Sequence, residues 1–536
     1  MLALSDPLLS WGLASPTDFL PAAHPVFSTT MNRVLSTFAL FACFARLTSS
    51  AADRPNIVFI LSDDIGYADL SCYGAKHAST PNLDRLATQG CRFTDAHSPA
   101  STCTPTRRAF ITGVYSWRQQ PESSIAPGDA AMAIEPGSST AASLVKSAGY
   151  RTGVVGKWHL GLGPEGGPDW NGEIKPSPLD LGFDDNFIMA ATGDRVPTVF
   201  IVGRRIVGLD PNDPITVSYK AKVGTDPTGR ENPELLTLKH THGHDMTIVN
   251  GVGRIGWMAG GTAARWKDED MSDTFAGKAV KFIDDNKAGP FFLFFATHGI
   301  HVPRVPHPRF RGTSSVGTRG DAIHELDDAV GQVLVTLDRL NLTGRTLVIF
   351  TSDNGGVMDD GYEDVGAFNY HPNAPLRGTK GTLFEGGHRV PFIARWPGRI
   401  KAGSESAAIM TLLDMPATFA ALVGSGIPTG QCTDSINVLP ALLGETNTSA
   451  RKDFVSHVGG TKGPFGVRAG PWKYISPGGG GYGKAAGGEA KGKAASQPQL
   501  YNLDTDLAEE KDLATSEPAK LKEMEALLAR IRGEPN

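Results

Sequence analysis

The sequence has few cysteines, little net charge and no long apolar run. Five cysteines in 536 residues are too few for a disulfide-stabilised scaffold. A net charge of -5 argues against a general affinity for nucleic acid, so any cationic site has to be local. The leader-like apolar stretch, residues 34–47, is shorter than the ~20 residues that cross a bilayer. We therefore expect a globular protein without a stable membrane span, large enough for a main domain and a smaller one.

Residues 31–52 have the layout of a secretory signal peptide. A start and a positive charge at residues 31–33 precede the apolar run, and small residues follow it up to Asp53. We predict that translation starts at Met31, that residues 1–52 form a leader region, and that the mature chain is secreted or periplasmic. A lipoprotein anchored at Cys43 is the alternative.

Short apolar runs alternate with amphipathic segments over most of the chain. Runs typical of buried strands are residues 56–61, 150–155, 290–296 and 346–351. Helical patterns cover residues 81–90, 139–148, 275–286 and 321–340. This alternation predicts an α/β fold, a mostly parallel central sheet flanked by helices.

The pattern changes past Gly424. Residues 465–474 and 499–503 resemble antiparallel strands, and residues 518–532 an amphipathic helix. We therefore predict a catalytic domain at 53–425 and a C-terminal α+β subdomain with an antiparallel sheet at 426–536. Within them, residues 187–274 are expected to be an insertion that walls a substrate pocket, and the Gly/Ala/Lys-rich residues 478–496 a mobile loop.

Polar clusters follow four of the predicted strands. They are Asp63-Asp64, Lys157 to His159, His298 to His301, and Asp353-Asn354. Parallel sheets bind ligands beyond the carboxyl ends of their strands, so an acidic and a basic group should share one rim. Three carboxylates and an amide there favour a hard cation, Ca²⁺ or Mg²⁺. The alternative is that each Asp or Asn only caps a turn.

Residues 101–113 begin with small polar side chains and end in an apolar run. This pattern predicts a loop that turns into a helix, with Pro105 in its first turn. Cys103 would then lie at the helix N-terminus, where free N–H groups favour an anion, and Arg107 would point to the same place. A buried structural thiol beside a solvated arginine is the alternative.

The run Cys103-Thr104-Pro105-Thr106-Arg107, followed by Thr112-Gly113, resembles the signature of the type I sulfatases, in which the cysteine is oxidised to formylglycine after synthesis. Residues 149–159 resemble that family's second signature, and residues 376–387 resemble a further sulfatase segment. The resemblance covers most of the chain and points to the arylsulfatase-like branch of the alkaline phosphatase superfamily. It implies a formylglycine-generating maturation enzyme as a partner, and Ca²⁺ rather than Mg²⁺.

The resemblance also implies the site. The metal ligands are Asp63, Asp64, Cys103, Asp353 and Asn354, and the catalytic residues are Cys103, Arg107, Lys157, His159, His301 and Lys380. Substrate-binding candidates, which no firm motif supports, are Thr192, Asp194, His244 and His298. His298 is also the alternative to His301, and His244 alternatively only holds its own loop together.

The mechanism that the resemblance implies has two steps. The hydrated formylglycine attacks sulfur in line while His301 or Lys380 protonates the departing alcohol. His159 then takes a proton from the second hydroxyl, which expels sulfate and restores the aldehyde. Arg107 and Lys157 hold the diol and the sulfate oxygens.

The expected function is an exported sulfatase that hydrolyses a sulfate monoester of a carbohydrate, or an aryl sulfate. A phosphonate or phosphodiester hydrolase of the same superfamily is one alternative, and a catalytically silent sulfated-glycan-binding protein is another. With Cys103 in the site and Cys43 in the leader, three cysteines remain at positions 72, 91 and 432. At most one disulfide can form among them.

Overall fold

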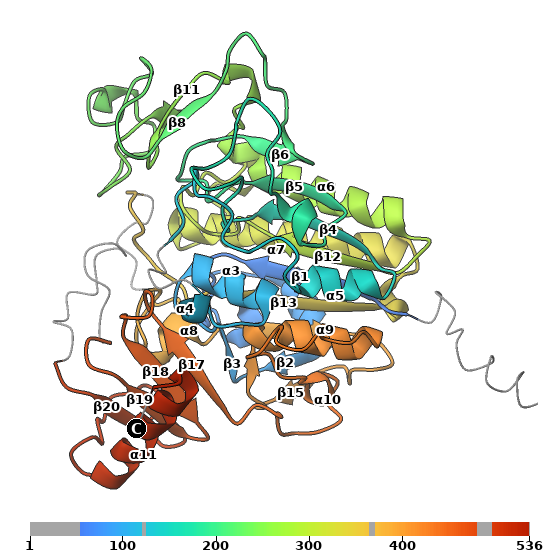
Figure 1. The fold of residues 1–536 in the computed structure, drawn as a ribbon, viewed down its shortest axis with the longest axis vertical. Coiled ribbons are helices and arrows are strands. Elements are labelled where there is room, and N and C mark those ends of the chain that lie inside the picture. The colour runs from blue at the N-terminus through green and yellow to red at the C-terminus, as the bar shows by residue number, and fades with distance from the viewer. Residues whose placement is uncertain (1–53, 120–124, 364–369, 480–495, 535–536) are drawn as a thin grey trace, which may run out of the picture. The chain divides into compact units, whose positions relative to one another are not determined.

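A mixed sheet of ten strands forms the centre of the protein (Figure 1). The computed structural model describes residues 54–119, 125–363, 370–479 and 496–534. In order across the sheet the strands are β15 (Ser404–Ser406), β2 (Cys91–Phe93), β14 (Phe392–Arg395), β13 (Thr346–Ser352), β1 (Asn56–Ser62), β12 (Phe291–Ala296), β4 (Arg151–Lys157), β5 (Asp185–Met189), β6 (Phe200–Val202) and β7 (Arg205–Ile206). The five strands from β13 to β5 are mutually parallel, which confirms the predicted α/β fold.

Alternating side chains of β1 supply two hydrophobic cores, one on each face of the sheet. Ile57, Phe59 and Leu61 belong to one core, and Val58 and Ile60 to the other. Helices α3 (Cys103–Thr112), α5 (Ala141–Ser147) and α9 (Met415–Val423) contribute to the first core. Helices α2 (Pro81–Thr88), α6 (Met271–Asn286) and α7 (Gly317–Arg339) contribute to the second. Both faces of the central sheet are buried, which explains why its parallel strands are apolar throughout.

Helix α3 is fixed to the sheet by aromatic packing. The ring of Phe110 stacks on that of Phe59, with centroids 4.3 Å apart, and also packs against Phe294 on β12. The helix begins at Cys103 and has Pro105 in its first turn, as predicted. It ends at Thr112, and the next residue, Gly113, has a positive φ of 65° that suits glycine just after a helix. Cys103 therefore stands at the end of a rigid element.

The C-terminal part of the chain forms a separate antiparallel sheet, as predicted. Its strands are β17 (Asp453–His457), β18 (Phe465–Ala469), β19 (Trp472–Ile475) and β20 (Gln499–Asn502). Helix α11 (Pro518–Arg532) packs on this sheet through Met524, Leu527 and Leu528. The domain boundary at residues 425 and 426 stays a prediction, since residues 51–536 group as one unit.

The remaining elements are short. They are α4 (Ser116–Gln119), α8 (Glu385–His388), α10 (Leu439–Leu442), and the strand pairs β3 (Ala96–His97) with β16 (Met410–Thr411), β8 (Thr216–Ser218) with β11 (Trp257–Ala259), and β9 (Ile248–Val249) with β10 (Val252–Gly253). No helix of the described residues is long and apolar enough to cross a bilayer. The predicted leader and most of the predicted mobile loop, residues 480–495, lie outside the described residues.

Two features differ from the sequence-based expectation. The predicted insertion at 187–274 overlaps the central sheet, because β5 pairs in parallel with β4 and β6 and β7 continue the edge. Strands of two or three residues are too short to show a period in the sequence, which is why this edge was missed. Helix α6 also begins earlier than predicted, at Met271. The described cysteines, at positions 72, 91, 103 and 432, are all free.

Candidate active site

The carboxyl ends of neighbouring strands bring the predicted acidic and basic side chains together. Asp63 and Asp64 follow β1, and Asp353 and Asn354 follow the neighbouring strand β13. Lys157 ends β4, which is separated from β1 by β12. Each of these five side chains is fully buried. The four charged groups therefore interact with one another rather than with water, and each of the five polar side chains needs a partner.

Direct ion pairs join the acidic group to the basic group. Lys157 Nζ lies 2.6 Å from Asp63 Oδ2, and Arg107 Nε lies 2.8 Å from Asp353 Oδ2. Arg107 also donates from Nη1 to the carbonyl oxygen of Lys157, at 3.0 Å. Because Arg107 stands one turn into α3, these contacts fix the position of Cys103 relative to the sheet.

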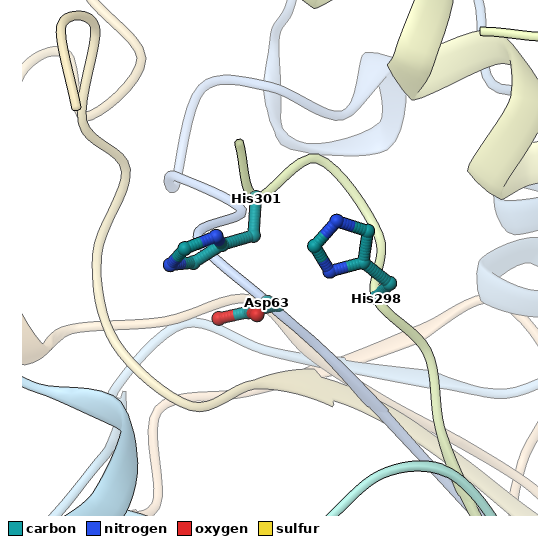
Figure 2. A group of neighbouring side chains, drawn as sticks. All are labelled: Asp63, His298 and His301. Carbon is teal, nitrogen blue, oxygen red and sulfur yellow. The ribbon is translucent and has the colours of Figure 1, made fainter. Parts of the chain in front are cut away.

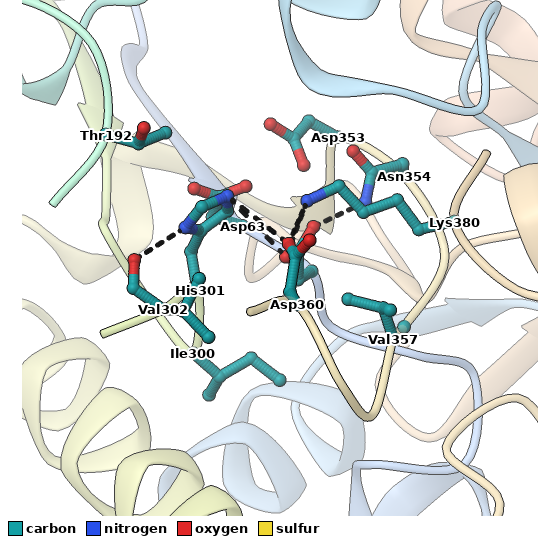
Figure 3. A network of polar contacts seen from close by, with 12 residues as sticks. Asp63, Thr192, Ile300, His301, Val302, Asp353, Asn354, Val357, Asp360 and Lys380 are labelled. Atoms are coloured by element: carbon teal, nitrogen blue, oxygen red, sulfur yellow. Dashed lines mark hydrogen bonds and ion pairs between the residues drawn. The ribbon is translucent and has the colours of Figure 1, made fainter. Parts of the chain in front are cut away.

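Asp64 lies at the centre of a second network, whose other members Asn354, Lys380 and His301 are labelled in Figure 3. Asn354 Nδ2 donates to its Oδ1 at 2.7 Å, and Lys380 Nζ lies 2.9 Å from its Oδ2. The ring nitrogen Nε2 of His301 lies 3.9 Å from the same Oδ2. The network thereby unites residues from three separate strand ends and from the loop that carries Lys380.

Three buried side-chain oxygens in this group have no hydrogen-bond partner among the described residues. They are Oδ1 of Asp63, Oδ1 of Asp353 and Oδ1 of Asn354. Asp63, Cys103 and Asp353 also place one potential ligand atom each within 4.8 Å of one another. Buried oxygens without donors are costly unless a cation takes the place of those donors. The donor set therefore fits a hard divalent ion such as Ca²⁺.

Two residues of the group have left-handed backbone. The φ angles of Asp64 and His159 are 64° and 59°. Non-glycine residues seldom adopt this region, and where they do the surrounding structure holds them there. Asp64 lies two residues after the end of β1, and His159 lies two residues after the end of β4.

The two carboxylates that face Cys103 have opposite pKa shifts. Burial alone would raise the pKa of Asp63, but Lys157, His301, Arg107 and Lys380 outweigh it and hold the pKa well below its usual range. Burial, with the neighbouring charge of Asp63, raises the pKa of Asp353 to about 6. The opposing shifts show that negative charge is crowded here, which a divalent ion would relieve.

His159 is held neutral. Burial first, and then the charge of Lys157, lowers its pKa well below the ordinary value. Its Nε2 lies 3.0 Å from the carbonyl oxygen of Ala126, to which that nitrogen donates its proton. Its Nδ1 is buried and has no partner. The ring can therefore accept a proton at Nδ1.

His298 and His301 lie side by side next to Asp63 (Figure 2). His301 Nδ1 donates to the carbonyl oxygen of Val302 at 2.8 Å, which leaves Nε2 directed at the carboxylates of the site. His298 makes no hydrogen bond through either ring nitrogen, and burial, followed by the charge of His301, lowers its pKa to about 3. The hydrogen bond orients His301 alone, which favours the predicted choice between the two.

Cys103 is 1% exposed and its sulfur lies among charged groups. Burial raises the pKa of its thiol, although the charges of Lys157 and Lys380 oppose that shift. The encoded cysteine is therefore a thiol at neutral pH and a weak nucleophile. If this cysteine were converted to formylglycine, the aldehyde oxygen would take the place of the sulfur.

Three of the four predicted substrate-binding residues form a cluster beside the site, and the fourth, His298, lies with Asp63 and His301. The hydroxyl of Thr192 bonds to Asp194, and His244 Nε2 lies 3.0 Å from Asp194 Oδ2. Arg195 Nη1, which sequence analysis did not single out, lies 3.1 Å from Asp194 Oδ1. All members of the cluster but Arg195 are buried, and Thr192 faces the same space as Asp63 and His301 (Figure 3).

Asp360 is a second residue that the sequence analysis missed. Its Oδ2 lies 2.8 Å from Lys380 Nζ and 3.7 Å from His301 Nε2. Burial would raise its pKa, but Lys380 and His301 lower it to about 2, so the carboxylate is charged. The acidic pair Asp359-Asp360 within a glycine-containing loop was the only signal available in the sequence.

Comparisons with known proteins agree with this geometry. A family model described as Sulfatase matches residues 55–425. An N-acetylgalactosamine-6-O-sulfatase from Bacteroides thetaiotaomicron is 46% identical over 488 residues, which cover 90% of this chain and 94% of that one. Human arylsulfatase A is 32% identical over 431 residues, 79% of this chain and 75% of that protein.

A solved structure shows the same similarity in three dimensions. It comes from work on glycosaminoglycan metabolism by Bacteroides thetaiotaomicron and is 47% identical to this chain. The two superimpose with a TM-score of 0.86, over 90% of this chain and 100% of the other. The similarity therefore extends over most of this chain and over the whole of the other.

Proposed function

The chain belongs to the sulfatase family and is a sulfuric ester hydrolase, and we propose that it removes the 6-O-sulfate of N-acetylgalactosamine in a sulfated polysaccharide. The observation that carries this substrate is the 46% identity, over nearly the full length of both chains, to an enzyme with that activity. Thr192, Asp194 and His244 supply a polar cluster beside the site that suits a sugar.

We propose that Cys103 becomes formylglycine through a maturation enzyme and that Ca²⁺ is held by the side chains at 63, 64, 353 and 354. The unpaired oxygens of Asp63, Asp353 and Asn354 support the ion. The formylglycine would supply a hydrated aldehyde as the nucleophile, and the ion, when bound, would supply a fixed positive charge.

The chain's own residues bind the sulfate and move protons. Arg107 and Lys157 are buried cations beside residue 103 and neutralise the charge of the sulfate oxygens. Burial would lower the pKa of Lys380, but Asp360 and Asp64 raise it well above its ordinary value. Lys380 therefore holds its proton firmly, and His301 Nε2 is the better donor to the leaving alcohol.

His159 is the base on this account. Its neutral ring has a free Nδ1, so it takes a proton at that atom while Nε2 keeps its bond to the carbonyl of Ala126. His301, which is directed at carboxylates, therefore acts as the acid. His159, which is surrounded by cations, acts as the base.

We also propose that the mature chain is exported. The signal-peptide pattern of residues 31–52 supports this, and so does a polysaccharide substrate, which is met outside the cytoplasm. Fractionation of the native host, with N-terminal sequencing of the mature protein, tests the proposal. A cytoplasmic protein that retains residues 31–52 would contradict it.

Substrate kinetics test the function. The enzyme, produced together with a formylglycine-generating enzyme and Ca²⁺, should release sulfate from N-acetylgalactosamine 6-sulfate faster than from the 4-sulfate or from an aryl sulfate. Phosphate mono- and diesters should react far more slowly. A preference for phosphodiesters would support the hydrolase alternative, and sugar binding without any turnover would support the silent glycan-binding protein.

A further inference from the structure

Arg108 is a buried arginine that has no counter-charge among the described residues. The residue is 5% exposed, and its Nε and Nη1 atoms are buried without a hydrogen-bond partner in the described part of the chain. Burial lowers the pKa of the guanidinium to about 10, and no acidic neighbour offsets this shift. The group is therefore still charged at neutral pH.

Several other buried arginines of the described residues have carboxylate partners, whereas Arg395 donates to the amide oxygen of Gln89. Arg254 pairs with Asp268 and Arg319 pairs with Asp69, at 2.7 and 2.6 Å. Arg107, the neighbour of Arg108 on α3, pairs with Asp353 in the active site. Successive residues of a helix point about 100° apart, so Arg108 cannot share that partner. An unpaired buried charge is costly, and Arg108 lacks the compensation that Arg107, Arg254 and Arg319 have.

Arg108 lines a cavity of about 250 Å³ that is separate from the catalytic group. Its polar lining includes Thr112, Gln119, Ser138, Ser139 and Gln431. The Oε1 of Gln431 accepts a hydrogen bond from the backbone N–H of Ser139 at 3.1 Å, which leaves the amide NH₂ of Gln431 as a donor. The cavity therefore combines an unpaired guanidinium with neutral donors, which is the chemistry of an oxyanion site.

We propose that this cavity binds a small tetrahedral oxyanion, sulfate or phosphate, on Arg108. Sulfate has a direct source, because the reaction of a sulfatase releases it. Glu135 is the single carboxylate among the described lining residues and is exposed, so it leaves the buried side of the cavity to the anion. Since Arg108 lies on the helix that begins with Cys103, the bound anion would stabilise the element that carries the catalytic residue.

Thermal unfolding in sulfate, phosphate and chloride at constant ionic strength tests the proposal. Sulfate or phosphate should raise the Tm of the wild-type enzyme, and the half-saturating concentrations identify the preferred anion. In Arg108→Met the concentration needed should rise at least tenfold. Lys281→Met, which removes one exposed positive charge on α6, should behave as the wild type does.

A second measurement needs no variant and separates the cavity from the active site. Crystals of the wild-type enzyme soaked in selenate should show an anomalous peak within hydrogen-bond distance of Arg108, in addition to any peak near residue 103. A peak near residue 103 alone would overturn the proposal. So would an equal anion response of the Arg108→Met and Lys281→Met variants, or a structure in which Glu135 pairs with Arg108.

Discussion

Lys380 Nζ lies 2.8 Å from Asp360 Oδ2, at the same time as it contacts Asp64. The ammonium group therefore bridges a carboxylate of the predicted metal group and one that comes from a neighbouring loop. Asp360 also lies 3.7 Å from His301 Nε2, so it influences both candidates for the group that protonates the leaving alcohol. We therefore expect Asp360 to act as a positioning residue for the reaction.

Replacing Asp360 should impair turnover more than stability. Asp360→Asn removes one charge-assisted bond to Lys380, worth ~1.5–3 kcal/mol, so kcat should fall about tenfold to a hundredfold. The measurement is steady-state kinetics on the sulfated sugar, with Asp359→Asn as the matched control. Among the described residues the Asp359 carboxylate accepts hydrogen bonds only from Thr241 and from the backbone N–H of Gly361. Equal losses in the two variants would show that the loop, and not the Lys380 contact, matters.

Removing the divalent ion should destabilise the enzyme as well as inactivate it. Without a cation, the unpaired oxygens of Asp63, Asp353 and Asn354 remain buried beside one another. Chelation should therefore lower the Tm, and added Ca²⁺ should restore it with a dependence on its concentration. Elemental analysis should find one ion per chain in the wild type and much less in Asp353→Ala. An unchanged Tm after complete metal removal would contradict this assignment.

Glu325 on α7 should make stability depend on pH. Burial raises the pKa of this carboxyl to about 7. A raised folded-state pKa means that ionisation opposes folding, so the folded state loses stability as pH rises from about 4.5 to about 7. Glu325→Gln keeps a carbonyl acceptor for the backbone N–H of His307 but cannot ionise. Urea unfolding should show this variant gaining on the wild type over that interval, by ~3 kcal/mol at most. A constant difference from pH 4 to 8 would rule the effect out.

Helix α2 should depend on a cap from another helix. Its N-cap residue, Thr80, makes no capping bond, and Asp327 of α7 accepts from the backbone N–H groups of Asn82 and Leu83 instead, at 3.0 and 2.8 Å. Asp327→Ala should therefore lower the free energy of unfolding by ~1–2 kcal/mol, as loss of an N-cap does. Asp285→Ala, which breaks an exposed i,i+4 pair, should cost ~0.3–0.5 kcal/mol. Similar losses in both variants would refute the capping role.

The central sheet and the meeting of the acidic and basic groups could be predicted from the sequence. Asp63 and Asp353 each follow a continuous apolar run, and such runs are buried parallel strands whose carboxyl ends share one edge. That rule requires only the order of residues along the chain. It placed Lys157 on the same edge for the same reason.

Asp360, Arg195 and Arg108 could not be predicted in this way, because their environments come from distant segments. Asp360 matters through Lys380, which lies twenty residues further along a loop with no periodicity. Arg108 has no carboxylate partner among the described residues, and no local sequence pattern encodes the absence of a partner. The sheet edge formed by β6 and β7 was missed because strands so short carry no periodic signal.

The most direct test is sulfate release from N-acetylgalactosamine 6-sulfate by the wild type and by Cys103→Ala, both produced with the maturation enzyme. Mass spectrometry of the peptide that contains residue 103 should be run on the same wild-type sample. We expect formylglycine at residue 103, rapid release by the wild type, and loss of at least a thousandfold in Cys103→Ala. Equal rates for the two proteins, or full activity with an unmodified cysteine, would contradict a reaction centred on residue 103.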